Sequence, residues 1–182
     1  MTTDSFRSLV AAVVASSQAG SWRAAVQEWV VTDVEDDPDQ QGICVCGQTG
    51  LGQLFTIKNR ISGAELSPIG SVCVNKFEQA DLDRQVTVFA ELLTLRKAIR
   101  EGKTISLTSE FFSRALLEYF FHQDVFQPNQ WNGQDAENDY EFLVDMFNKR
   151  DKDAISTKRK AKIYMLLKTT VLPFVEAGDV SR

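Results

Sequence analysis

Residues 42–50 read GICVCGQTG and place Cys44 and Cys46 one residue apart. Side chains two positions apart on an extended backbone point the same way, so these two thiols share a direction. Gly47 follows at once and tolerates positive φ, which permits the chain to curl. A zinc ion with bonds of about 2.3 Å to sulfur needs its sulfurs roughly 3.8 Å apart, a separation that a tight turn supplies. The stretch therefore predicts a metal-binding knuckle.

The third cysteine, Cys73, lies in PIGSVCVNKFE (68–78), where a predicted strand ends and a helix begins. Backbone amides at the start of a helix favour an anionic thiolate. The 26 residues between Cys46 and Cys73 contain LFTIKN (54–59), a turn at Ser62 and Gly63, and a return strand toward Ile69. This pattern predicts a β-hairpin. Both ends of a hairpin return to one place, so we expect the three sulfurs to gather.

A tetrahedral zinc ion needs a fourth ligand beside Cys44, Cys46 and Cys73. His122, the only histidine, would complete a set of three cysteines and one histidine. The other candidates are Glu78, Asp81, a water molecule or a group from a partner. Two further interpretations of the cysteines stay open: buried thiols that act as small apolar side chains, and a redox pair.

The elements CVCG (44–47) and LFTIKNRISGAELSPIGSVCVNKF (54–77) resemble a treble-clef or zinc-ribbon-like module. More narrowly, they resemble an element of small, poorly characterised proteins of bacteria, prophages and mobile elements. NDYEFLVDMFNKR (138–150) accompanies that element in the resemblance. A standard treble clef has C-x-x-C in its knuckle and a second ligand one turn into its helix, and this chain has neither. The resemblance implies a Zn²⁺ site and makes nucleic acid a credible partner.

The composition is that of a folded protein, with 43% hydrophobic residues and twelve phenylalanines in 182 residues. No apolar run approaches the 18 to 20 residues that a membrane helix needs, so we expect no membrane partner. LVAAVVA (9–15) follows a leader that contains Asp4, which favours an amphipathic first helix over a signal peptide. Three cysteines are too few for a secreted disulfide scaffold of this size. We therefore expect a cytoplasmic protein.

Three regions follow one another along the chain: an N-terminal helix (1–26), a zinc-ribbon-like β unit (27–77) and a helical domain (78–182). We expect them to pack as one compact unit. VQEWVV (26–31) is predicted to be the first strand, because it combines β-branched and aromatic residues. The predicted fold class is α+β and predominantly helical, with a small zinc-stapled β-hairpin unit packed on a helical bundle.

Apolar residues at helical spacing predict four helices in the third region. The first covers residues 82–99 and is stopped by Gly102. The second begins at Thr108 or Ser109 and runs through Phe121. After a loop at 127–139, Asp139 caps a third, short helix. Ser156 or Thr157 opens the last, which ends near Pro173 because proline cannot continue a helix.

Charge is unevenly distributed, although the chain carries a net −5. Residues 33–39 contain five acidic residues and are predicted to form a solvated loop. Residues 149–162 carry seven basic residues against two acidic ones. A phosphate-binding face is one interpretation, and an exposed helical surface is the other. The residues of the predicted nucleic-acid-binding face are Lys58, Arg60, Lys76, Lys149, Arg150, Lys158, Arg159 and Lys160, with Phe55 or Trp131 as stacking groups.

Common enzyme signatures are missing from the sequence. One histidine leaves little room for a hydrolase triad, and the glycines of GQTGLG (47–52) fit no nucleotide-binding loop. We therefore expect a non-enzymatic, zinc-stabilised binding protein of phage or mobile-element origin, with nucleic acid as its first candidate partner. A protein–protein interaction factor, such as a phage-derived inhibitor or an accessory protein, is the alternative. A metal-dependent or thiol enzyme is the third hypothesis.

Overall fold

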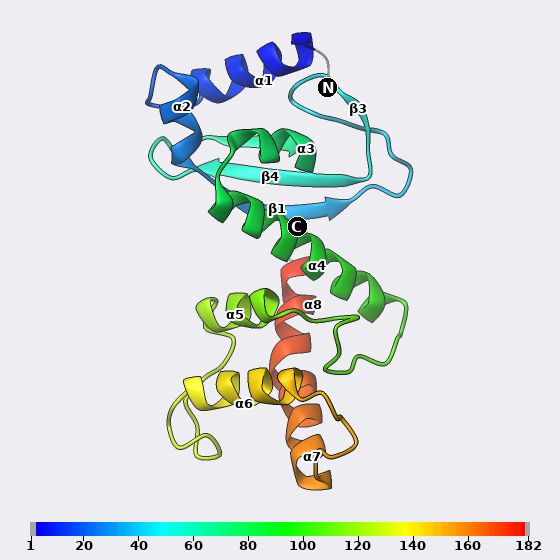
Figure 1. Cartoon of the computed structure of the whole chain (residues 1–182). Helices are drawn as coiled ribbons and strands as arrows, with labels where there is room; N and C mark the ends of the chain where they lie inside the picture. Colours follow the sequence, from blue (N-terminus) through cyan, green and yellow to red (C-terminus); the bar gives the residue numbers. More distant parts are fainter. Residues whose placement is uncertain (1–2, 181–182) are drawn as a thin grey trace. The chain divides into compact units, whose positions relative to one another are not determined.

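The computed structural model describes residues 3–180, and side-chain surroundings through residue 177. The chain divides into two compact units, Met1–Leu93 and Thr94–Arg182, and the boundary falls within helix α4 (Ala80–Arg100). Helices account for 51% of the residues and strands for 14%. The prediction of a mixed fold that is mostly helical, with a small sheet, is therefore confirmed (Figure 1).

A three-stranded antiparallel sheet forms the centre of the first unit. It contains β1 (Trp29–Asp36), β4 (Gln53–Asn59) and β5 (Glu65–Ile69), in the order β1-β4-β5. Phe55 and Ile57 alternate along the central strand and are fully buried. The predicted hairpin between residues 54 and 69 is confirmed as β4 and β5, and Gly63 adopts a φ of +75° in the turn between them.

Short helices cover the sheet of the first unit (Figure 1). They are α1 (Thr3–Ala15), α2 (Trp22–Ala25), α3 (Ser71–Val74) and the 3₁₀ turns η1 (Val26–Glu28) and η2 (Asn75–Phe77). Leu9 and Val13 of α1 are fully buried, as expected for one face of an amphipathic helix. Aromatic rings in edge-to-face contact connect three of these elements. The ring centroid of Trp22 lies 5.6 Å from that of Phe6 and 5.2 Å from that of Phe77.

Two predictions about the first strand are wrong. Strand β1 begins at Trp29 instead of residue 26, because residues 26–28 form η1 and turn Glu28 into the interior. The acidic segment 33–39 is not a loop throughout, since residues 33–36 belong to β1. A bulge between Val31 and Asp33 shifts the pairing register and returns Val34 to the core. Because of that shift, apolar and polar residues do not alternate strictly along β1, and the sequence pattern does not identify the full strand.

A buried polar network joins η1 to the end of β4. The Glu28 carboxylate accepts hydrogen bonds from the Asn59 amide at 2.6 Å and from the backbone N–H groups of Gln18 and Ala19, both at 2.9 Å. Asn59 is fully buried, and its Oδ1 accepts the backbone N–H groups of Ile61 and Ser62 at 2.8 Å. These bonds fix the turn of the hairpin. The Asn59 amide, and then the two backbone donors, hold the pKa of Glu28 below its usual range.

The second unit is helical. It contains the end of α4, α5 (Arg114–His122), α6 (Glu137–Asn148), α7 (Thr157–Leu166), the π-helical segment η3 (Leu167–Val171) and α8 (Leu172–Val180). Helices α5 and α6 run side by side (Figure 1), and each contributes fully buried side chains, such as Phe120 and Leu143. Within residues 3–180, no helix is both long enough and apolar enough to cross a membrane.

Two of the predicted helix boundaries are confirmed and three are wrong. Gly102 follows α4 with a φ of +69°, and the Ser156 hydroxyl caps α7 by accepting the N–H of Arg159. Helix α5 starts only at Arg114, because Ser113 is the residue whose hydroxyl caps it. Asp139 is not a cap. It lies inside α6, which begins at Glu137, and is buried between the Asn132 amide at 2.9 Å and the Lys162 ammonium at 2.7 Å.

The helix after Ser156 does not end near Pro173, contrary to the prediction. The chain passes from α7 through η3 into α8 without leaving the helical conformation. Proline lacks an N–H group and its ring crowds the preceding turn. The wider π-helical turn just before Pro173 accommodates both effects, since such turns relax the regular hydrogen-bond ladder.

The Glu28 network generates a prediction about stability and pH. Because the pKa of Glu28 is lowered in the folded chain, its contribution to stability is present above the unfolded value of about 4.5 and is lost as the pH falls through the folded value. We expect Glu28→Gln to destabilise the protein at pH 7 and much less at pH 3.5. Urea denaturation at the two pH values measures this difference.

Glu65→Gln, which removes an exposed pair with Lys58, is the control and should have little effect at either pH. A difference between wild type and Glu28→Gln that is equal at both pH values contradicts the prediction.

Candidate metal centre

The paired cysteines lie in a tight turn between two short strands. Strands β2 (Gly42–Ile43) and β3 (Thr49–Leu51) pair with each other, and residues 44–48 connect them. The N–H of Gly47 donates to the Cys44 carbonyl at 2.7 Å, and the N–H of Cys44 donates to the Gln48 carbonyl at 2.8 Å. Gly47 adopts a φ of +84°, as its position after Cys46 predicted. The predicted knuckle is therefore present.

The knuckle is attached to the main sheet next to the third cysteine. The N–H of Val45 donates to the Pro68 carbonyl on β5 at 3.0 Å. Five residues after Pro68, Cys73 lies in α3, where its N–H donates to the Gly70 carbonyl at 2.9 Å. The end of the hairpin thus delivers Cys73 to the knuckle, by the route that the sequence predicted.

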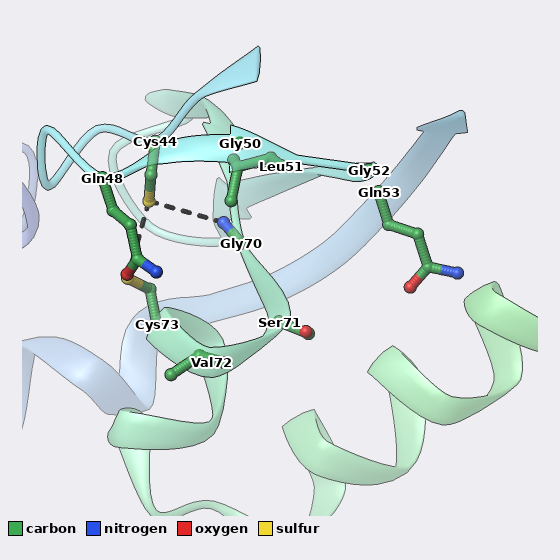
Figure 2. A pocket seen from close by; sticks show the side chains of 10 residues that line it. All are labelled: Cys44, Gln48, Gly50, Leu51, Gly52, Gln53, Gly70, Ser71, Val72 and Cys73. Carbon is green, nitrogen blue, oxygen red and sulfur yellow. Dashed lines mark hydrogen bonds between the residues drawn. The ribbon is translucent and has the colours of Figure 1, made fainter. Parts of the chain in front are cut away.

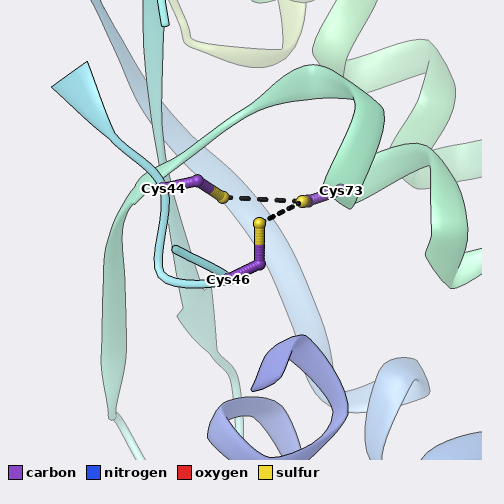
Figure 3. A group of neighbouring side chains, drawn as sticks. All are labelled: Cys44, Cys46 and Cys73. Carbon is purple, nitrogen blue, oxygen red and sulfur yellow. Dashed lines mark hydrogen bonds between the residues drawn. The ribbon is translucent and has the colours of Figure 1, made fainter. Parts of the chain in front are cut away.

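Three sulfur atoms converge at this point (Figure 3). The Cys73 sulfur lies 3.5 Å from the Cys44 sulfur and 3.4 Å from the Cys46 sulfur, and all three lie within 4.8 Å of one another. These distances exceed the roughly 2.05 Å of a disulfide bond and approach the roughly 3.8 Å between thiolates on one zinc ion. Each of the three cysteines is at most 3% exposed. The three cysteines could hold a metal ion.

The short contacts between the sulfur atoms shift the pKa values of Cys44 and Cys73 in opposite directions. The pKa of Cys44 is lowered to about 5, chiefly because its sulfur accepts a hydrogen bond from Cys73 and also because it accepts the N–H of Gly70 at 3.4 Å. The hydrogen bond to Cys44, followed by burial, raises the pKa of Cys73. Cysteine binds a metal ion as the thiolate, so metal binding at this cluster would release the thiol protons.

The candidates for a fourth ligand lie elsewhere on the chain. Glu78 and Asp81, both exposed, are outside the cysteine cluster. His122 ends α5 in the second unit, where its Nε2 lies 3.8 Å from the Glu118 carboxylate and its side chain is 66% exposed. The role of His122 as a metal ligand stays a prediction.

A pocket of about 350 Å³ lies beside the cluster (Figure 2). Cys44 and Cys73 form part of its wall, with Gln48, Leu51 and Val72 around them. Gly70 lies between these groups, and a Cβ at this position would lie 2.9 Å from a methyl group of Leu51. Sequence reasoning missed both the pocket and the N–H group that Gly70 donates to Cys44. The glycine in PIGSVC was the available signal, since it marks close approach of backbone to another group.

The structure divides the predicted phosphate-binding residues between the two units. Lys58, Arg60 and Lys76 belong to the first, where Lys58 pairs with Glu65 at 3.3 Å. Lys149, Arg150, Lys158, Arg159 and Lys160 belong to the second. Of the proposed stacking groups, Phe55 is fully buried in the sheet and cannot stack on a base, whereas Trp131 is 83% exposed.

Two other residues of the basic segment serve the interior of the second unit. Lys152 donates to the carbonyls of Met146 and Phe147 at the end of α6, at 2.8 and 2.7 Å, and Lys162 pairs with buried Asp139. By contrast, Lys158, Arg159 and Lys160 are exposed in the first turn of α7, and none has a carboxylate partner within the described part of the chain. The start of α7 thus carries three consecutive exposed cations.

Comparisons with protein-family models, with curated proteins and with solved structures give no match to this chain.

The cysteine geometry predicts one tightly bound metal ion for each chain. Free energies of about 10–16 kcal/mol for structural zinc, shared by three or four ligands, give about 2.5–5 kcal/mol for each ligand. Replacing any one of Cys44, Cys46 or Cys73 by serine should therefore weaken binding roughly 60- to 5,000-fold. Competition titration with a chromogenic chelator measures the affinity. Ser71→Ala, which changes a neighbouring residue without a thiol, is the control. Equal affinity in a serine variant and in wild type contradicts the assignment.

Proposed function

We propose that this chain is a zinc-stabilised protein that acts by binding a macromolecule and not by catalysis. One observation carries the proposal: three buried sulfurs from two distant segments lie close together around one point. Zinc is the ion of choice because it favours tetrahedral thiolate sets and needs no redox partner. The ion would join the knuckle to α3 and so stabilise the first unit. Thiolates bound to a metal ion are not free to form a disulfide, and three such ligands in one buried cluster fit a structural role.

The pocket beside the cysteines supports a binding role over an enzymatic one. None of the described residues that line it is a carboxylate, a histidine or a lysine. Apart from Cys44 and Cys73, which would be occupied by the metal ion, its polar side chains are Gln48, Gln53 and Ser71, which do not titrate near neutral pH. General acid–base catalysis needs a group whose pKa lies near the working pH. With the two thiols bound to the metal, the pocket would thus offer shape and neutral hydrogen-bonding groups.

The start of α7 is the proposed contact with nucleic acid. Lys158, Arg159 and Lys160 are exposed in one turn, and no acidic residue occurs between Asp153 and Glu176 in the sequence. A local excess of unpaired lysine and arginine side chains attracts the phosphate backbone. The likeness of the cysteine element to proteins of prophages and mobile elements adds to this proposal. The proposed location is the cytoplasm, where a reducing environment keeps thiols available for a metal.

A protein partner is the second candidate, and the charge of the first unit favours it. This unit carries six basic residues against twelve acidic ones, a net −6, whereas the second unit carries fourteen against thirteen, a net +1. A surface of the first unit would repel nucleic acid and attract a basic protein. In this alternative the zinc-stabilised unit itself provides the interface, and α7 is a solvated helix.

Electrophoretic mobility shift in a series of salt concentrations tests the nucleic-acid proposal. We expect retardation of DNA or RNA at low salt, with an affinity that falls steeply as salt rises. Changing Lys158, Arg159 and Lys160 together to glutamine should reduce the slope of log affinity against log salt by about 2 to 3, because each phosphate contact contributes about 0.7 to 0.9. The charge-matched control changes Arg7, Arg23 and Lys103 to glutamine, because these three residues do not belong to the start of α7. No retardation at low salt, or equal losses in both triple variants, contradicts the proposal.

The two candidate partners give opposite results with the same triple variant. If a basic protein binds the first unit, the α7 variant should retain that partner at full stoichiometry in an affinity-capture experiment from a bacterial lysate. Removal of zinc by a chelator should release the partner, because the first unit then loses its staple. A partner that the α7 variant loses and the chelated protein keeps contradicts this second candidate.

A further inference from the structure

The pocket reaches only one side of the cysteine cluster. Cys44 and Cys73 line it, whereas Cys46 is not among its lining residues. In Figure 2 the sulfur atoms of Cys44 and Cys73 point toward each other, and the side chain of Gln48 lies beside them. The pocket therefore adjoins the buried cluster at Cys44 and Cys73 and not at Cys46.

The pocket wall supplies no obvious fourth ligand of its own. Apart from the two cysteines, the described lining side chains are neutral amides, a hydroxyl and apolar groups, with glycines between them. Zinc prefers sulfur, imidazole nitrogen and carboxylate oxygen. A volume of about 350 Å³ exceeds by far the roughly 30 Å³ of a water molecule, so a ring-sized group has room.

Charge selects among ligands that could enter. Three thiolates outweigh the two positive charges of zinc, so the set already carries one excess negative charge. No lysine or arginine lines the described pocket, and the unit around it has a net −6. A thiolate or carboxylate in the fourth position would add a further negative charge without a cation to balance it. A neutral imidazole satisfies the preference for nitrogen at no such cost.

We propose that the fourth position of the zinc ion opens into this pocket and accepts a neutral imidazole. This inference rests on the proposed function, since it requires that the three thiolates hold the metal. Two sources can supply the imidazole: His122, the only histidine of the chain, or a histidine of a partner protein. In either case the metal centre is a point of attachment as well as a staple.

The rim of the pocket suits a polypeptide that carries such a histidine. Val72 is 54% exposed and offers an apolar contact at the mouth. Gly50 leaves open space along one wall, because a Cβ at this position would meet no atom within 4 Å. The amide side chains of Gln48 and Gln53 can bond to a peptide backbone.

Cobalt substitution tests the proposal, because the visible absorption of Co²⁺ reports the number and type of its ligands. Wild type and His122→Ala are loaded with one equivalent of Co²⁺ and titrated with free imidazole as the probe and with acetate as an anionic comparison. We expect imidazole to change the spectrum of His122→Ala in a saturable manner, and to bind at least about tenfold more tightly than acetate.

The response of wild type identifies the source of the imidazole. If His122 is the ligand, the wild-type spectrum differs from that of His122→Ala and does not change when imidazole is added. Imidazole added to His122→Ala then produces the wild-type spectrum. If a partner supplies the ligand, wild type and variant have equal spectra and equal imidazole responses. A His122→Ala protein that binds Co²⁺ through sulfur but ignores imidazole, or binds acetate equally well, overturns the proposal. Absence of any sulfur-to-cobalt absorption instead overturns the proposed zinc site itself.

A matched pair of bulky variants tests the route of entry in the His122→Ala background. Val72→Trp places an indole at the mouth of the pocket, whereas Ile43→Trp places one at a comparably exposed apolar position outside the lining, with Ile43 57% exposed. We expect Val72→Trp to weaken imidazole binding at least about tenfold and Ile43→Trp to leave it unchanged. Equal binding in both variants overturns entry through this pocket.

Discussion

The close approach of three sulfur atoms is the constraint that places the cysteine knuckle against the rest of the first unit. Cys44 and Cys46 come from a turn that contains little else to hold it, since β2 and β3 are only two and three residues long. Two-stranded elements of this size are not stable alone. The hydrogen bond from Val45 to Pro68 and the contacts with Cys73 attach the turn to the main sheet. The proposed metal ion would strengthen that attachment, because it would bind cysteines of both segments.

The sequence was sufficient to predict the features that depend on short-range chemistry. Gly47 after Cys46, the strand LFTIKN and the turn at Gly63 each indicate a local conformation, and the hairpin brings Cys73 to the knuckle. The bulge in β1 could not be predicted in this way. It interrupts the alternation that identifies a strand, and only pairing with β4 makes the extended conformation of residues 33–36 favourable.

Tertiary contacts also explain the errors in the helical unit. Asp139 has the side chain of a helix cap, but a buried position between Asn132 and Lys162 satisfies its carboxylate better than an exposed cap would. Pro173 usually ends a helix, yet the π-helical turn before it lets the chain continue. Tertiary contacts also divide the basic segment at residues 149–162. Lys152 and Lys162 bond to groups of the fold, whereas Lys158, Arg159 and Lys160 are exposed to solvent. Sequence alone presents all of them as one run of charge.

All three sulfurs lie within residues 44–73, in the first half of the chain. During synthesis, Cys73 therefore leaves the ribosome before any part of the unit at residues 94–182 emerges. Because N-terminal units generally fold first as a chain emerges, the three cysteines can gather while the helical unit is still being translated. If they bind the proposed zinc ion, a shortage of zinc would affect the first unit before the helical unit has emerged.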